Sequence, residues 1–116
     1  MASARVARGR RSQALLAEWF QARGWPDAKA REASLPGVDV YDMPGWAPEV
    51  KATEGQDFTG ALRQARANSG DDIPFVVYRP RGYGPEKIGK WVAAMDLEVL
   101  TAVMQELEEL RELHGK

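Results

Sequence analysis

The residues best suited to chemistry lie between Gly37 and Lys51. In this segment Asp39 precedes a Glu-x-Lys triplet formed by Glu49, Val50 and Lys51. Alternate side chains of a β-strand point to one face about 7 Å apart, so Glu49 and Lys51 share a face opposite Val50. If the preceding segment folds back beside this strand, Asp39 joins them. Two carboxylates and an ammonium would then converge, as required for a metal-dependent phosphodiesterase.

The same residues match what a magnesium ion needs. Mg²⁺ binds hard oxygen ligands and usually takes one or two carboxylates while keeping several waters. Asp39 and Glu49 supply the carboxylates, the backbone carbonyl of Val50 lies beside them, and Lys51 can position a water or stabilise developing charge. Glu-x-Lys alone is a weak signal, because alternating charges are common on exposed strand faces. The signal is stronger here because an aspartate and a Pro-Gly turn precede the triplet, and a helix and an apolar strand are expected to follow it.

Length and composition favour one globular domain. The 116 residues, 44% hydrophobic and 28% charged, suffice for a single core. No apolar run approaches the roughly 20 residues that span a bilayer, so no membrane partner is expected. The chain has no cysteine, which is compatible with a cytoplasmic location and leaves no thiolate metal site. We expect a flexible basic arm over residues 1–9 and one domain over residues 10–116.

Hydrophobic periodicity and turn residues predict the elements that position these side chains. Helices are expected at Arg10–Arg23, from Asp57 to about Asn68, and at Leu97–Leu113. Strands are expected at Val38–Asp42, Pro48–Thr53, Ile73–Tyr78 and Gly89–Met95, with a loop at 79–86. The segment 28–33 is either a short strand or an irregular connection. The fold class is therefore α/β, with a mixed central sheet flanked by helices in the order α-β-β-β-α-β-β-α.

Large apolar residues supply the expected packing. The four tryptophans, Trp19, Trp25, Trp46 and Trp91, are expected in the core or an interface. The last helix carries an apolar stripe formed by Leu97, Leu100, Met104, Leu107 and Leu110. This stripe is expected to pack on the sheet, with part of it available to a dimer interface.

Taken together, these features resemble the PD-(D/E)XK nuclease superfamily, and most closely the Holliday-junction resolvases of archaea and of actinobacterial phages. The resemblance extends from about Arg10 to Leu100. It rests on a Gly-Arg-Arg-Ser-Gln helix start, Gly37-x-Asp39-Val40, Pro44-Gly45, Glu49-Val50-Lys51 and Gln64. It implies a restriction-endonuclease-like core.

The resemblance also implies roles for individual residues. Asp39 and Glu49 would bind Mg²⁺, for which Mn²⁺ would substitute, and Lys51 would be the catalytic lysine. Gln64 would lie beside the site, although an ordinary exposed helix position is the alternative. Many such resolvases carry a glutamate ligand on the first helix. That position falls on Gln13 here, and Glu18 is a second candidate that is equally a surface charge.

Basic residues supply the candidate DNA contacts. Two groups are expected to contact phosphates: Arg5, Arg8, Arg10 and Arg11 near the N-terminus, and Arg79, Arg81, Lys87 and Lys90 around a glycine-rich loop. A solubilising tail is the alternative for the first group. Tyr83 in the loop either stacks on a base or packs beneath the loop. Gly82-x-Gly84 lacks a strand-to-helix turn, so no nucleotide cofactor is expected.

These observations lead to one expected function and two alternatives. The expected function is a Mg²⁺-dependent, structure-selective endodeoxyribonuclease that resolves four-way DNA junctions as a homodimer, in the host cytoplasm if phage-encoded. The near two-fold symmetry of the junction favours the homodimer. The alternatives are another nuclease of the superfamily, acting in nicking or repair, and a non-catalytic DNA-binding protein with the same fold.

Overall fold

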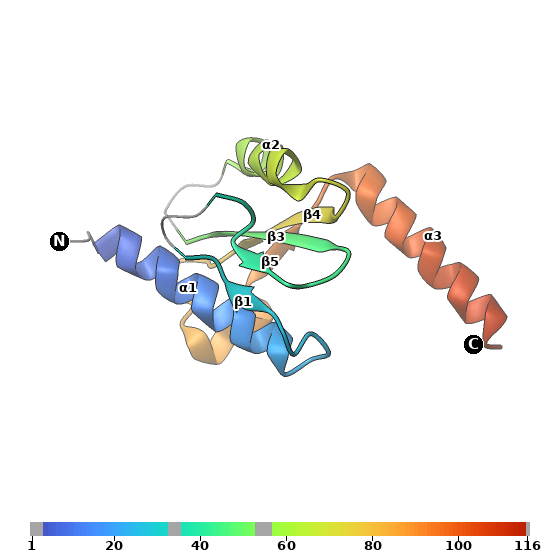
Figure 1. The fold of residues 1–116 in the computed structure, drawn as a ribbon, viewed down its shortest axis with the longest axis horizontal. Coiled ribbons are helices and arrows are strands. Elements are labelled where there is room, and N and C mark those ends of the chain that lie inside the picture. Colours follow the sequence, from blue (N-terminus) through green and yellow to red (C-terminus); the bar gives the residue numbers. More distant parts are fainter. Residues whose placement is uncertain (1–3, 33–35, 53–56, 116) are drawn as a thin grey trace.

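In a computed structural model, the described part of the chain folds into three helices, five strands and one short 3₁₀ helix (Figure 1). The structure describes residues 4–32, 36–52 and 57–115. In chain order the elements are α1 (Ala4–Gln21), β1 (Lys29–Ala30), β2 (Val40–Tyr41), β3 (Trp46–Lys51), α2 (Phe58–Ser69), β4 (Ile73–Tyr78), η1 (Pro85–Lys90), β5 (Val92–Ala94) and α3 (Leu97–Leu113). No helix in these ranges has the length and apolar character needed to cross a membrane.

The main sheet has three strands in the order β3-β4-β5. β3 and β4 are parallel, with Glu49 opposite Val76 and Lys51 opposite Tyr78, whereas β4 and β5 are antiparallel. β1 and β2 form a separate antiparallel pair. The expected α/β class with a mixed sheet between helices is therefore confirmed. The stated order of elements did not include η1, and β1 and β2 do not join the main sheet.

Alternating apolar side chains of the strands build two hydrophobic clusters, one on each face of the main sheet. Val50 and Phe75 pack on the α1 side with Leu16, whereas Val76 packs on the α2 side with Ala65. Trp91 is buried in the first cluster and the other three tryptophans pack against it, as expected. The sheet is therefore covered by α1 with β1–β2 on one face and by α2 on the other (Figure 1).

The bounds of α2 and β4 agree with the sequence because each has a clear local signal. Asp57 is the N-cap of α2, and its carboxylate accepts a hydrogen bond from the Gly60 amide at 2.9 Å. Gly70, with φ of 56°, ends the helix in a conformation that glycine adopts without strain. β4 covers Ile73–Tyr78, the bounds expected from its apolar run.

Several expected boundaries were wrong. α1 begins at Ala4, so residues 4–9, expected as a flexible arm, are helical; residues 1–3 lie outside the described ranges. Only Val40 and Tyr41 of the expected strand 38–42 are in a strand, and they pair with β1. β3 begins at Trp46, and Thr53, its expected end, lies outside the described ranges. Residues 85–90 form η1, which shortens the last strand to Val92–Ala94.

The position of α3 is the largest departure from expectation. Its bounds are as expected, but its apolar stripe does not pack on the sheet, and α3 has no buried residue. The helix extends away from the rest of the molecule (Figure 1). Asp96 precedes it as N-cap without a side-chain capping bond, and its carboxylate instead binds Arg66 of α2 at 2.7 Å. This ion pair links the start of α3 to the body.

Candidate metal centre

Asp39 lies at the free edge of β3, where the chain turns back as the sequence predicted. Its backbone amide donates to the carbonyl of Pro48 at 3.1 Å, and its Oδ2 accepts from the Val50 amide at 2.7 Å. The reversal between the two segments uses Gly45, whose φ is 89°, a value that favours glycine. The regular two-stranded pairing expected here is absent, but Asp39 is brought to the Glu-x-Lys strand.

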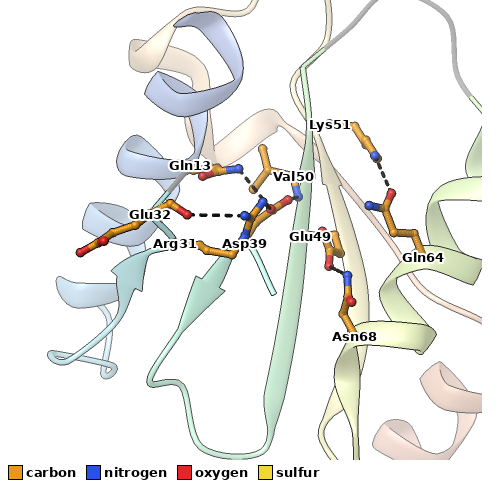
Figure 2. Close-up of polar contacts among 9 residues, drawn as sticks. All are labelled: Gln13, Arg31, Glu32, Asp39, Glu49, Val50, Lys51, Gln64 and Asn68. Carbon is orange, nitrogen blue, oxygen red and sulfur yellow. Dashed lines mark hydrogen bonds and ion pairs between the residues drawn. The ribbon is translucent and has the colours of Figure 1, made fainter. Parts of the chain in front are cut away.

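The other oxygen of Asp39 binds two further side chains (Figure 2). Gln13 of α1 donates from Nε2 to Oδ1 at 3.1 Å, and Nη2 of Arg31 lies 3.0 Å from the same oxygen. Asp39 is only 5% exposed, so this carboxylate is buried and its charge is balanced by a guanidinium. Buried carboxylates normally require such partners.

Glu49 is buried on the face of β3 that α2 covers. It is 2% exposed, and its Oε1 accepts a hydrogen bond from Nδ2 of Asn68 at 2.9 Å. Burial is the main cause that raises the pKa of Glu49 to about 7, and the neighbouring Asp39 carboxyl raises it further. Asn68 and Lys51 act in the opposite direction. The two carboxyl groups are therefore neighbours, and Glu49 lacks a full counter-charge.

Lys51 lies on the same face of β3 as Glu49, as the strand period predicted. Its Nζ donates to Oε1 of Gln64 on α2 at 2.9 Å (Figure 2). Val50 lies between them and packs into the opposite hydrophobic cluster. The alternation of Glu49, Val50 and Lys51 between the two faces of the sheet is thus confirmed. Gln64 is exposed on α2 and also contacts the lysine.

The backbone of β3 also contributes to this edge. Pro48 and Val50 direct their polar backbone groups toward Asp39, because the Pro48 carbonyl accepts from Asp39 and the Val50 amide donates to it. Lys51 faces the other way, since its carbonyl accepts from Arg79 beside β4. Strand geometry therefore directs the Val50 carbonyl to the same edge as the Asp39 carboxylate.

These residues partly fit a divalent cation. Two adjacent buried carboxylates, one of them short of positive charge, and a nearby carbonyl are the oxygen ligands that Mg²⁺ uses with several waters. Two observations limit the fit. Arg31 already balances Asp39, and within the described ranges no group of three or more histidine, cysteine, aspartate or glutamate side chains is placed to hold a metal. A bound ion would therefore depend on Asp39, Glu49, Val50 and water.

The structure distinguishes Gln13 from Glu18, the two candidates for a metal ligand on the first helix. Gln13 contacts Asp39 directly, whereas Glu18 is exposed. Five positions along an α-helix rotate a side chain by roughly 140°, so Glu18 cannot face the cluster that Gln13 faces. The residue that α1 adds to the cluster is an amide, which donates to Asp39 and brings no negative charge.

Sequence reasoning missed two residues of the cluster. Asn68 lies four positions after Gln64 on α2, and this spacing places both side chains on one helix face. That spacing was a readable signal, since Gln64 had been assigned to the site. Arg31 follows the two-residue strand β1, in a segment whose sequence has no clear periodicity, and no pattern indicated that it would reach Asp39.

The two candidate DNA-binding groups meet at Arg79. This residue is 9% exposed; its Nη1 donates to Oγ of Ser12 at 3.0 Å and its Nε to the Tyr83 carbonyl at 2.9 Å. Burial, followed by the charges of Arg8 and Arg11, lowers the pKa of Arg79. Arg79 therefore joins the loop to α1, and its burial argues against the direct phosphate contact that was expected of it.

The remaining basic candidates are accessible to different degrees. Arg8 is half-buried and its Nε donates to the Ala52 carbonyl at 2.9 Å, just after β3. The exposed candidates are Arg10, Arg11, Arg81, Lys87 and Lys90, and the side chain of Arg5 lies outside the described residues. Tyr83 is half-buried against the core, which favours its packing role, with Nζ of Lys87 5.0 Å from its ring.

Comparisons with known proteins leave this geometry as the main guide to function. No protein-family model matches the chain, and neither the curated proteins nor the solved structures include a similar one.

Proposed function

We propose that this chain is a Mg²⁺-dependent, structure-selective endodeoxyribonuclease of the PD-(D/E)XK type, acting on branched DNA such as a four-way junction. One observation carries the proposal. The carboxyl groups of Asp39 and Glu49 are neighbours at the edge of β3, with Lys51 on the same face as Glu49. The order α1, β1 to β3, α2 and β4 supports a restriction-endonuclease-like core in the sequence of elements, although β1 and β2 form a pair apart from β3.

The side chains of the chain can divide the work of phosphodiester hydrolysis. Asp39, Glu49 and the Val50 carbonyl would hold the ion; when bound, Mg²⁺ stabilises charge on phosphate oxygens and lowers the pKa of a coordinated water. Lys51 places an ammonium beside the carboxylates, where it can orient a water or stabilise the developing negative charge. Gln64 accepts a hydrogen bond from that ammonium and so fixes its direction.

The basic residues support DNA as the substrate. Arg8 reaches the end of β3 immediately beyond Lys51, and the exposed Arg11 lies near Arg8 and Arg79. Positive charge from Arg8 and Arg11 of α1, with the buried Arg79, therefore collects at the end of β3 that carries the lysine. A phosphate backbone bound there would lie close to the carboxylates. Each phosphate that these residues neutralise would contribute to the affinity for DNA.

A second candidate, a non-catalytic DNA-binding protein of the same fold, is favoured by one specific contact. Arg31 already occupies Oδ1 of Asp39 at 3.0 Å, as a structural ion pair would. In that reading the carboxylates organise the edge of β3 and the arginines alone bind DNA. The two candidates differ in whether cleavage occurs, not in whether DNA binds.

A cleavage assay separates the candidates. The purified chain would be incubated with a synthetic four-way junction, a flap and a plain duplex, each with Mg²⁺ or with EDTA. We expect Mg²⁺-dependent, paired cuts in the junction. Equal cutting of plain duplex would indicate another nuclease of the superfamily, and tight binding without cleavage would support the non-catalytic candidate.

Matched variants test the assignment of the residues. Glu49→Gln and Lys51→Ala should abolish cleavage while leaving junction binding within about threefold of the unmodified chain. Lys29→Ala is the control, because Lys29 is an exposed lysine whose ion pair with Asp42 is long at 4.0 Å. Asp39→Ala is a poor test, since it removes the acceptor for Val50, Arg31 and Gln13 and would disturb folding. Normal turnover by Glu49→Gln or Lys51→Ala would refute the assignment.

A further inference from the structure

The outward face of α3 is an apolar surface that the body does not cover. Met104, Leu107 and Leu110 are 56%, 45% and 47% exposed, and Leu97 and Leu113 are more exposed still. An ordered helix with a continuous exposed apolar stripe normally marks an interaction surface. Asp96, held by Arg66, ties the first turn of α3 to the body, and the helix extends away from the body beyond that point (Figure 1). The side chains of the stripe are therefore open to solvent along most of the helix.

The stripe has the spacing of a coiled-coil seam. Alternating steps of three and four residues join four apolar positions: Leu100, Val103, Leu107 and Leu110. In heptad notation these are a, d, a and d, the positions that face a partner helix. Leu97 and Met104 fall at e positions and Leu113 at a g position, so they widen the seam on both sides. The pattern fits one partner helix packed alongside α3.

The charged residues next to the seam indicate which helix can pack against α3 and in which direction. Glu106 is a g residue and Arg111 is the e residue five positions later. In a parallel two-stranded coiled coil the g residue of one helix faces this e residue of the other. Within one chain Nη1 of Arg111 lies 2.8 Å from Oε1 of Glu108, in an exposed ion pair that solvent screens. Two copies of α3 in parallel would add the attraction between Glu106 and Arg111 twice. An antiparallel pair would instead bring g residues opposite g residues and lose both attractions.

The outer positions of α3 argue against other occupants. Glu108, Glu109 and Glu112 lie away from the seam and give the helix a net negative charge. Such a helix is repelled by DNA and by anionic membrane surfaces. We propose that α3 is a parallel homodimerisation helix, and that the partner covering its apolar stripe is α3 of a second copy of this chain. The inference does not depend on nuclease activity.

The oligomeric state of the full chain tests the proposal directly. Light scattering after gel filtration and sedimentation equilibrium would measure the mass over roughly 1–500 µM. We expect a concentration-dependent dimer of the 12.9 kDa chain. Leu107→Glu should weaken the dimer more than 100-fold without unfolding the chain, because Leu107 is exposed in the monomer, and circular dichroism checks the fold. Glu112→Gln, on the outer face, is the matched control. A monomer at every concentration would overturn the proposal.

Two further experiments test the orientation. Glu106→Arg and Arg111→Glu should each weaken dimerisation by about fivefold, whereas the double exchange should restore it to within about twofold. The chain has no cysteine, so a single introduced thiol can report proximity. His114→Cys, at the C-cap that directly follows α3 and in sequence register with the a positions, should form a disulfide-linked dimer rapidly, and Gln105→Cys, at an outer f position, should not. A stable dimer in which His114→Cys fails to cross-link, or one that Leu107→Glu leaves intact, would refute a parallel α3 pair.

Discussion

Nη2 of Arg31 lies 3.0 Å from Oδ1 of Asp39, so a guanidinium holds the carboxylate that the proposed metal centre needs. The Arg31 side chain is 24% exposed and that of Asp39 is 8% exposed, so solvent screens this ion pair only in part. A divalent ion at the same edge would add positive charge beside a carboxylate that is already balanced. Arg31 and a metal ion bound there would therefore compete for the same negative charge.

Replacing Arg31 measures that competition. Arg31→Ala leaves Asp39 buried without its cation and should lower the free energy of unfolding in EDTA by about 2 kcal/mol, less than for a fully buried pair. Mg²⁺ should then raise the melting temperature of the variant more than that of the unmodified chain. Thermal unfolding with and without Mg²⁺ checks both effects. Lys29→Ala, on the neighbouring strand, is the control, and an equal response to Mg²⁺ in all three proteins would contradict the expectation.

The raised pKa of Glu49 predicts a specific pH dependence of stability. In the folded state the carboxyl group of Glu49 keeps its proton up to about pH 7, whereas the ordinary pKa of a glutamate is 4.5. Folding therefore favours the protonated form. The contribution of Glu49 to stability is largest below pH 4.5, falls as the pH rises toward 7, and is constant above that.

Glu49→Gln removes this dependence because a glutamine does not titrate but can still accept a hydrogen bond from Asn68. In EDTA, the variant should gain stability relative to the unmodified chain between about pH 5 and 7, reaching on the order of 2–3 kcal/mol at pH 8. Urea unfolding at several pH values measures the difference. Glu112→Gln, exposed on α3, is the control. A difference between Glu49→Gln and the unmodified chain that does not change with pH would show that Glu49 titrates normally.

The elements with strong local signals could be predicted from the sequence. α2 has an aspartate cap and a terminal glycine, β4 is an apolar β-rich run, and the period of two in β3 fixed the faces of Glu49 and Lys51. These features depend on residues close in sequence. The approach of Asp39 to β3 was also predictable, because a Pro-Gly turn lies between them.

Other features depend on packing between distant segments, which a single sequence does not encode locally. Arg31 reaches Asp39 only because the short pair β1–β2 places it there. Arg79 was expected to bind DNA but is buried against Ser12 of α1, 67 positions away along the chain. The stripe of α3 has the same period whether it packs on a sheet or on a second helix, so its exposure could not be inferred.

Gln64 is predicted to act through Lys51. Gln64→Leu removes the acceptor that holds the ammonium at 2.9 Å, and because Gln64 is exposed the fold should be unaffected. On a four-way junction we expect kcat to fall by about tenfold with little change in KM, since the loss concerns orientation of the lysine. Arg63→Ala, the preceding exposed position of α2, is the control. A change confined to KM would instead assign Gln64 to DNA binding.

Arg11 and Arg79 are predicted to respond differently to substitution, although both were candidates for DNA contact. Arg11 is exposed, so Arg11→Ala should leave the melting temperature unchanged and weaken junction binding. If it neutralises one phosphate, the slope of log K against log salt should become shallower by about 0.9.

Arg79 is held by Ser12 and by the Tyr83 carbonyl, so its loss should affect folding first. Arg79→Ala leaves the buried hydroxyl of Ser12 and that carbonyl without their donor and should cost about 2 kcal/mol of stability. Binding measured where the variant is folded should keep the salt slope of the unmodified chain. A stable Arg79→Ala variant with a shallower slope would mean that the guanidinium contacts phosphate directly. That result would require the loop after β4 to release Arg79 from α1 when DNA binds.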